Sequence, residues 1–355
     1  MNLEDIAKKA GVSRSTVSRV INDEPHVSEK TRRRVLAIIQ REGFSPNHAA
    51  RALVTQRTNI VSVVVPQTMN IFFGDNSYYP MLLQGMSEAI SQRDRAMLLW
   101  LQQMNERVEV FIERVLSSRR MVDGFIISSV RSNNPIFDYL INLKTTFVMV
   151  ERPWRLDEKV NYVTIDNIAA GRMAVKHLIG LGRKRIATIT GDMLIADAQD
   201  RLAGYKAALV EAGMPVNPDL IFHGYFNAEY GYHGMKYLLQ YKPDALFAAG
   251  DTTAVGAIKA IREAGLRVPD DIAVIGHDDL DVAAQYNLTT IYHPVQRKGF
   301  EAASLLIDMI EGKVTEPRHI ILPIHLIVRD TCGADPLWNQ NNREVRYEPM
   351  PNSPT

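Results

Sequence analysis

Residues 3–22 read Leu-Glu-Asp-Ile-Ala-Lys-Lys-Ala-Gly-Val-Ser-Arg-Ser-Thr-Val-Ser-Arg-Val-Ile-Asn, and this stretch decides how the first part of the chain folds. Its apolar residues recur at the i, i+3, i+4, i+7 spacing of one helical face, at Leu3, Ile6, Ala7 and Ala10. Gly11 favours a turn that ends this helix, and Ser13 is a suitable N-cap for the next one. Because the turn is so short, the second helix is expected to cross the first as a helix-turn-helix.

The second helix is expected to turn a polar edge outward. Hydroxyl groups can bind phosphate oxygens, and a long arginine can reach guanine N7 and O6 in a major groove. The predicted outward edge offers both kinds of side chain, at Ser13, Arg14, Ser15, Thr16, Ser18 and Arg19. A third helix is predicted after Ser28, with Gly43 beyond its end. The pattern indicates DNA binding, and the alternative is a three-helix interaction domain with a serine-rich surface.

Charge separates the beginning of the chain from the rest. Residues 1–57 contain 11 Lys and Arg against 6 Asp and Glu, and the remaining residues contain 30 against 34. This asymmetry favours a polyanion-binding head on a soluble body, although a moderately basic segment can also be an ordinary solvated face.

The single cysteine, Cys332, excludes an internal disulfide and is typical of a reducing compartment. No signal peptide and no apolar run of about 18 residues is evident, so a cytoplasmic protein without a membrane segment is expected.

From Asn59 onward, short apolar runs alternate with amphipathic stretches of helical length. Strands are predicted at 60–65, 96–101, 124–127, 146–150, 186–189, 245–248 and 272–275. Helices are predicted at 80–92, 105–118, 169–181, 199–212, 228–240, 253–264 and 297–310. Repeated strand–helix–strand order implies parallel sheets, and this many strands favour two doubly wound lobes with a cleft between them.

The head resembles that of the lactose-repressor (LacI/GalR) family. The matching motifs are Asp5-Ile-Ala-Lys-Lys-Ala-Gly-Val-Ser, Thr16-Val-Ser-Arg-Val-Ile-Asn, Val27-Ser-Glu-Lys-Thr-Arg and Phe44-Ser-Pro-Asn. The resemblance implies that Arg14, Ser15 and Arg19 read base edges and that Leu3 touches the groove. It implies that phosphates are held by Ser13, Thr16, Ser18, Asn22, Ser28 and Thr31. The operator sequence does not follow, because members differ most at Arg14 and Ser15.

Residues 47–58 are expected to join a head at 1–46 to the body. Within them, Asn47–Val54 has helical character but is too short to be a stable helix alone in water. In the family this segment forms a hinge helix when two chains sit on an operator, and Leu53 matches the leucine that enters a central base step. Asn47 and Ala50 would contact DNA with it. An ordinary linker is the alternative.

The body, placed at 59–332, resembles the periplasmic-binding-protein-like core of the same family over about Ile60 to Arg329. The chain is expected to cross between lobes near Ile165, Ile291 and Pro323, with the ligand between the lobes at the carboxyl ends of parallel strands. The motifs that carry the match are Val163-Thr-Ile-Asp-Asn, His177-Leu-Ile-Gly-Leu-Gly, Asp200-Arg-Leu-Ala-Gly-Tyr, Val268-Pro-Asp-Asp-Ile-Ala-Val-Ile-Gly-His-Asp-Asp and Leu288-Thr-Thr-Ile. The tail at 333–355 is predicted to be disordered and is given no function.

Sugar recognition needs carboxylates, arginine and amides for hydroxyl groups, and an aromatic face for the ring. The resemblance places Glu151, Arg201, Asp278 and His293 at the ligand, and strand ends add Asp251. Aromatic candidates are Phe226, Phe73 and Tyr79, the last two from an enlarged loop at 68–80 that could admit a disaccharide. Asp251 or Asp278 could instead cap a turn, Arg201 could pair internally, and the aromatic residues could be core. Gly250 and His293 depart from the residues common in sugar-responsive members, which leaves the ligand's identity open.

These features favour a ligand-responsive transcription regulator, expected to be a repressor with a mono- or oligosaccharide effector. A purine-like corepressor is the alternative. No enzyme, cofactor or metal is expected, because Cys332 has no evident histidine partner and the histidines show no metal-ligand spacing. A transport protein would share the body but needs export. A homodimer, or a higher oligomer, is expected on palindromic operator DNA in the cytoplasm at the nucleoid.

Overall fold

The computed structural model describes residues 2–21, 24–44, 57–68, 77–103, 106–128, 130–155, 157–335 and 346–347. The chain forms two compact units, Met1–Thr58 and Asn59–Thr355. Most of the predicted hinge and tail lies outside the described residues. So do five predicted site residues: Asn22, Asn47, Ala50, Leu53 and Phe73.

The first unit contains the three predicted helices, α1 (Leu3–Ala10), α2 (Arg14–Ile21) and α3 (Glu29–Arg41). Gly11 ends α1 with a φ of 60°, a left-handed conformation that glycine adopts without steric cost. The helices share a core that includes Ile6, Val17 and Val35, all fully buried. The apolar residues that recur at helical spacing in the sequence are therefore the ones that form the core. The polar edge of α2 is left on the surface.

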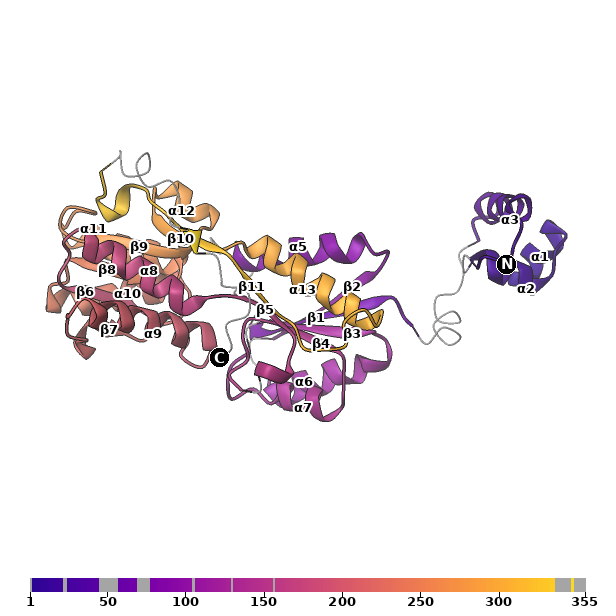
Figure 1. Cartoon of the computed structure of the whole chain (residues 1–355), viewed down its shortest axis with the longest axis horizontal. Helices are drawn as coiled ribbons and strands as arrows, with labels where there is room; N and C mark the ends of the chain where they lie inside the picture. Colours follow the sequence, from indigo (N-terminus) through magenta and orange to yellow (C-terminus); the bar gives the residue numbers. More distant parts are fainter. Residues whose placement is uncertain are drawn as a thin grey trace. The chain divides into compact units, whose positions relative to one another are not determined.

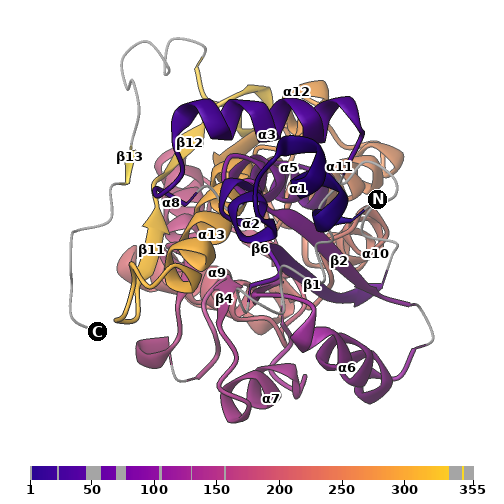
Figure 2. The same ribbon diagram turned by 90° about the vertical axis from the view of Figure 1, so that its right-hand side faces the viewer.

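In the second unit, the N-terminal lobe is built on a six-stranded parallel sheet with the order β11-β5-β4-β3-β1-β2. Its strands are β1 (Ile60–Thr68), β2 (Ala96–Gln102), β3 (Gly124–Ser128), β4 (Phe147–Val150), β5 (Tyr162–Ile165) and β11 (His319–Leu322). Strands β11 and β2 form its two edges (Figure 2). One face is covered by α5 (Tyr78–Ser91) and α13 (Val295–Ile310), and the other by α6 (Val108–Ser117) and α7 (Ile136–Asn142) (Figure 1).

The C-terminal lobe is built on a seven-stranded sheet with the order β13-β12-β10-β9-β8-β6-β7. Its strands are β6 (Ile186–Ile189), β7 (Ile221–Phe222), β8 (Ala245–Ala248), β9 (Ala273–Asp278), β10 (Thr289–Tyr292), β12 (Ile324–Ile327) and β13 (Arg346–Tyr347). Helices α8 (Asn167–Gly180) and α9 (Ala196–Glu211) cover one face, α10 (Ala228–Leu238) and α11 (Asp251–Glu263) cover the other, and α12 (Asp281–Gln285) follows β9 (Figure 1). The prediction of two parallel-sheet lobes is confirmed, and this sheet adds antiparallel pairing at one edge, where β12 pairs with β10 and β13.

The chain crosses between the lobes after β5, after β10 and between β11 and β12. These crossings lie where the sequence predicted them, near Ile165, Ile291 and Pro323. Because β5 and β10 both lead into a crossing, the carboxyl ends of both parallel sheets lie at the lobe boundary, which is where open α/β sheets bind ligands. Strand β12 starts at that boundary, which is why it runs opposite to β10. Within the described residues no helix is long and apolar enough to cross a membrane.

Candidate functional site

A group of hydroxyls gathers at the N-terminus of α2. Ser13 Oγ lies 2.7 Å from Ser15 Oγ and 2.9 Å from Thr16 Oγ1, and it accepts a hydrogen bond from the Thr16 amide at 3.2 Å. The first turn of α2 has no acidic residue, so the positive end of the helix is not neutralised there. Amides, hydroxyls and the helix dipole together make a site suited to a phosphate.

The other predicted DNA contacts on the described part of the head lie at least partly on its surface. Arg14 and Arg19 are exposed, whereas Leu3 and Ser18 are partly buried. Arg19 Nε lies 3.7 Å from Glu24 Oε2, an exposed ion pair that contributes little and leaves the guanidinium available to a base. Ser28 caps α3 by accepting from the Thr31 amide, so both residues stand at a second helix N-terminus.

In the body, Glu151 directly follows β4 and is buried among polar partners. Its Oε1 accepts from the Tyr78 hydroxyl at 2.8 Å and forms an ion pair with Lys298 Nζ, and its Oε2 accepts from Thr164 Oγ1 at 3.0 Å. Lys298 Nζ also donates to the Tyr78 hydroxyl at 2.7 Å. Glu151 has a φ of 83°, a strained value for this residue type that concentrates at functional sites.

Lys298 and Tyr78 reach this position because α13 and α5 pack without a gap. A Cβ atom added at Gly85 would lie 1.8 Å from the Gln296 carbonyl oxygen, so glycine is required at the helix contact. Burial lowers the pKa of Lys298 well below its usual value, and burial raises the pKa of Tyr78 well above its usual value. The N-terminal lobe therefore presents a buried group of polar side chains that hydrogen-bond one another at the boundary.

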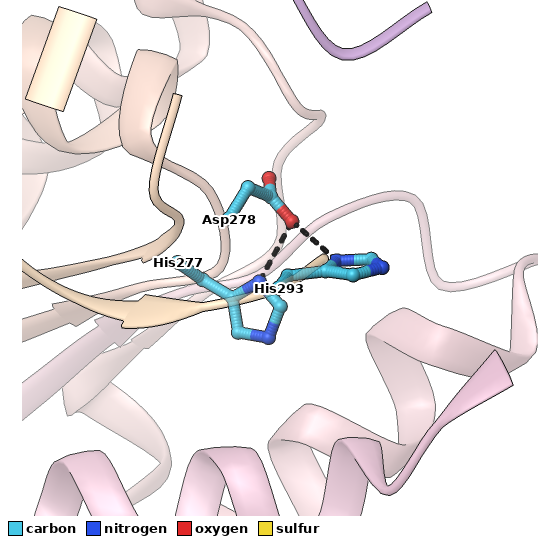
Figure 3. Close-up of side chains that lie close together, drawn as sticks. All are labelled: His277, Asp278 and His293. Carbon is cyan, nitrogen blue, oxygen red and sulfur yellow. Dashed lines mark hydrogen bonds and ion pairs between the residues drawn. The ribbon is translucent and has the colours of Figure 1, made fainter. Parts of the chain in front are cut away.

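The matching group in the C-terminal lobe is centred on Asp278, the last residue of β9. Its Oδ1 accepts from His277 Nδ1 at 2.8 Å and from His293 Nδ1 at 3.1 Å, as Figure 3 shows, and lies 3.8 Å from Arg201 NH2. Burial and then the charge of Arg201 lower the pKa of His277 to about 3. Burial alone would raise the pKa of Asp278, but the two histidines and Arg201 hold it well below its usual range. Asp278 is therefore ionised and His277 neutral.

Arg201 and Phe226 lie against each other beside Asp278. The guanidinium donates to Asn167 Oδ1 at 2.8 Å and to the Ala249 carbonyl at 2.5 Å, and its carbon lies 5.6 Å from the Phe226 ring centroid. A Cβ added at Gly191 would lie 2.0 Å from Phe226 Cζ, so the ring packs directly over that glycine. Phe226 is thus held at the carboxyl end of the sheet.

Two predicted ligand residues turn away from this group. Both oxygens of Asp251 are used within the lobe, since Oδ2 accepts from the Leu280 amide at 2.8 Å and Oδ1 from Thr290 Oγ1 at 2.6 Å. Tyr79 is 5% exposed and belongs to the core beneath α5. The hydrogen bonds of Asp251 hold the strand ends that carry Asp278.

Four residues of the site were not predicted from the sequence: Tyr78, Asp197, His277 and Lys298. Lys298 could have been found from the sequence, because it is a charged residue in the apolar stripe of α13 that is buried with Val295, Ala302 and Leu306. Asp197 precedes Arg201 by one helical turn on α9 and is buried beside it. A charged residue on an otherwise apolar helical face needs a buried partner.

Two contacts bear on metal binding and catalysis. His277, Asp278 and His293 offer donor atoms within 4.8 Å of one another, a group that the sequence spacing did not indicate. The hydrogen bonds to Asp278 occupy Nδ1 of both histidines, and the nearby guanidinium of Arg201 disfavours a cation. The prediction that Cys332 lacks a histidine neighbour is wrong, since His177 Nε2 lies 3.4 Å from its sulfur. Burial lowers the pKa of His177 to about 4, so this neutral imidazole does not supply the charge that activates a catalytic thiolate.

Comparisons with known proteins identify relatives over nearly the whole chain. Residues 2–47 match bacterial regulatory proteins of the lacI family, and residues 175–332 match a periplasmic binding protein-like domain. The HTH-type transcriptional regulator CelR of Thermobifida fusca is 38% identical over 93% of this chain and 97% of its own. The HTH-type transcriptional repressor PurR of Pasteurella multocida is 33% identical over 94% of this chain and 98% of its own.

Solved structures give the same result. A complex of the transcriptional regulator CelR with cellobiose superimposes with a TM-score of 0.73 at 36% identity, covering 93% of this chain and 99% of that one. The lac repressor dimer bound to operator and the anti-inducer ONPF gives a TM-score of 0.80 at 26% identity, covering 94% and 99%.

Proposed function

This chain belongs to the LacI family of bacterial regulatory proteins and is a DNA-binding transcriptional regulator, and we propose that a carbohydrate bound between its lobes sets its affinity for operator DNA. The observation that carries the proposal is the meeting of polar side chains from both lobes at the strand ends. The Tyr78 ring lies 5.9 Å from the His293 ring, which brings the Glu151 group of one lobe next to the Asp278 group of the other.

These groups suit a sugar. Charged side chains can bind hydroxyls with charge-assisted hydrogen bonds, and the Phe226 ring can lie against the apolar face of a pyranose. We assign direct contacts to Glu151, Arg201, Asp278 and His293, and supporting roles to Asp251 and Tyr79. The relative solved with cellobiose supports a sugar effector. A purine-like corepressor is the alternative, favoured by the relatives named PurR.

The regulator is proposed to act as a repressor and as a homodimer on a palindromic operator, in the cytoplasm at the nucleoid. Two heads double the number of specific contacts, and a two-fold protein matches a two-fold site. A related lac repressor has been solved as a dimer on its operator. Titration of labelled operator should reach saturation at two chains per site, and one chain per site would contradict the dimer.

Calorimetric titration with and without operator DNA tests the coupling. Cellobiose, other neutral sugars and nucleobases are the ligands to compare. Because coupling is reciprocal, operator DNA must change the affinity for the effector by the same factor as the effector changes the affinity for operator. A sugar that binds equally tightly in both cases would reject the proposal, and coupling seen only with a nucleobase would favour the corepressor.

Asp278→Asn should weaken effector binding while DNA affinity without effector stays near that of the wild type. Asp219→Asn is a matched control, because Asp219 is an exposed carboxylate on the same lobe. A loss of DNA affinity in Asp278→Asn that exceeds the loss in the control would contradict the assigned role.

A further inference from the structure

Several buried polar atoms have no hydrogen-bond partner among the residues that the structure describes, and three of them belong to side chains around Asp278. These three are Oδ1 of Asp197 and Nε2 of both His277 and His293. The two imidazole centroids lie 5.7 Å apart, and Asp197 interacts electrostatically with Arg201 first, and then with Asp200, His293 and Asp278. Buried polar groups are nearly always paired, so a cluster of unpaired ones indicates where a ligand completes the bonding.

Asp278 determines which ring nitrogen of each histidine carries a proton. An ionised carboxylate only accepts, so His277 and His293 must each donate their Nδ1 proton to its Oδ1 (Figure 3). A neutral imidazole that donates at Nδ1 has its lone pair at Nε2. Burial and the charge of Arg201 lower the pKa of His277 to about 3, so its imidazole is neutral and its free Nε2 is an acceptor.

Carboxylate oxygens add to this set of acceptors. Asp197 is buried, and although burial raises its pKa to about 6, its carboxylate is ionised at neutral pH and above. The second oxygen of Asp278, Oδ2, would lie 3.6 Å from a Cβ at Gly250, so the absence of a side chain at position 250 leaves space beside it.

The cations at the boundary are already matched. Lys298 pairs with Glu151, and Arg201 donates to Asn167 and Ala249 and lies beside Asp278. Arg201 also interacts with the carboxylate of Asp197, so one guanidinium faces two carboxylates, those of Asp197 and Asp278. An anionic ligand would bring a further negative charge, and more acceptors, to atoms that need donors.

We propose that the effector is an uncharged, hydroxyl-rich carbohydrate, and that sugar phosphates and sugar acids are excluded by the acceptor atoms of Asp197 and His277. Each hydroxyl of such a ligand can donate to one acceptor, which a carboxylate or phosphate group cannot do. The inference rests on the proposed function and narrows its effector class.

Matched ligands test the inference on the full-length wild-type protein. Cellobiose is compared with cellobionate, and glucose with gluconate and glucose 6-phosphate, by calorimetry at pH 7.5 with and without operator. The neutral member of a binding pair should bind more tightly by about tenfold or more, because a buried acceptor left without a donor is costly. An acid or phosphate that binds as tightly as its neutral parent overturns the inference while the proposed function stands.

A variant of Asp197 tests whether this residue causes the preference for neutral over acidic sugars. Asp197→Asn replaces an acceptor oxygen by an amide that can donate, so the affinity ratio of neutral to acidic sugar should fall by about tenfold, and Asp219→Asn should leave it unchanged. The ratio is informative even if the variant is less stable. An unchanged ratio in Asp197→Asn would remove Asp197 from the inference. If no sugar of the panel binds or shifts operator affinity, the proposed function fails and this inference fails with it.

Discussion

Arg152, which follows β4 in the N-terminal lobe, forms a two-pronged ion pair with Asp200 on α9 of the C-terminal lobe. Its NH2 lies 2.9 Å from Asp200 Oδ1 and its Nε lies 3.2 Å from Oδ2. Arg131 makes a second bridge to Asp192 at 2.5 Å. These contacts join the lobes near the Asp278 group, so they oppose the opening that releases a ligand.

Arg152→Ala should therefore speed effector release. The pair is partly exposed, with a side-chain exposure of 34% for Arg152, so the expected gain in dissociation rate is about two- to fivefold. Stopped-flow displacement measures it. Arg155→Ala is the control, because Arg155 pairs with Asp138 inside the N-terminal lobe. Equal dissociation rates in the two variants would show that the bridge does not hold the lobes.

Lys298→Met should destabilise the body by about 3–5 kcal/mol, because it leaves the carboxylate of Glu151 buried without its cation. The double variant Glu151→Gln/Lys298→Met should recover much of that loss. Urea unfolding followed by tryptophan fluorescence measures both. Lys259→Met is the control, since Lys259 is 69% exposed. A double variant no more stable than Lys298→Met alone would contradict the pairing.

Stability should fall as the pH is lowered from about 6.5, partly because of His277. Its pKa is 6.5 in the unfolded chain and about 3 in the folded one, so between these values the unfolded state binds more protons. At pH 5 the contribution of His277 to the loss is at most about 2 kcal/mol. His177 acts in the same direction, whereas Asp197, with its pKa raised to about 6, opposes the loss between about pH 6 and 4.

His277→Asn isolates this effect, because the asparagine amide can still donate to Asp278 but does not titrate. The variant should lose less stability than the wild type between pH 7 and pH 5, measured by urea unfolding. His233→Gln removes an exposed histidine and serves as the control. Identical pH dependence in His277→Asn and the wild type would show that His277 is not buried in its neutral form.

Arg19→Ala should cost about 1–3 kcal/mol on operator DNA and little on random DNA, because it removes a base contact. Arg33→Ala is a matched control on α3, where Arg33 pairs with Glu29 at 3.0 Å on an exposed surface. Competition binding at fixed salt gives both affinities. Equal losses on the two DNAs for Arg19→Ala would assign Arg19 to the phosphate backbone instead.

Ala50→Gly addresses the predicted hinge helix, which lies outside the described residues. Glycine should cost about 1 kcal/mol of helix propensity per chain and weaken operator binding, with effector affinity of the free protein almost unchanged. Binding measured with and without DNA separates these effects. Unchanged operator affinity would favour an ordinary linker.

The long elements and several short apolar strands, such as β6 and β8, were predictable from the sequence, whereas other short elements were not. Helices such as α9 and α13 offer enough residues for a 3.6-residue period to be evident, and β1 is a nearly continuous apolar run. By contrast, β10 is a four-residue strand and α7 a seven-residue helix, lengths at which a period does not distinguish helix from strand. The antiparallel pairing of β12 depends on which sheet it joins, which no local pattern specifies.

The site was predictable where a residue directly follows a strand. Glu151 and Asp278 fulfil that condition, and the sequence pointed to both. The prediction of Tyr79 instead of Tyr78 has a simple cause, because the helix was expected to begin at Pro80 and begins at Tyr78. The two extra residues place Tyr79 on the buried side and Tyr78 at the boundary. Asp197 was missed because its environment includes Asp278 and His293, which are distant in sequence and come together only in the tertiary structure.

Because the chain crosses between the lobes three times, the N-terminal lobe cannot be completed until most of the C-terminal lobe has been synthesised. The strands β1 to β5 are made first, but α13, which covers one face of their sheet, begins only at Val295. About 130 residues lie between Ile165 and Val295, and at about 5–20 residues per second a ribosome needs roughly 6 to 26 seconds to add them. Throughout that interval the apolar side chains of β1 lack their final cover. The nascent chain is therefore most exposed to aggregation while its second lobe is being translated, and assistance from a chaperone would matter most then.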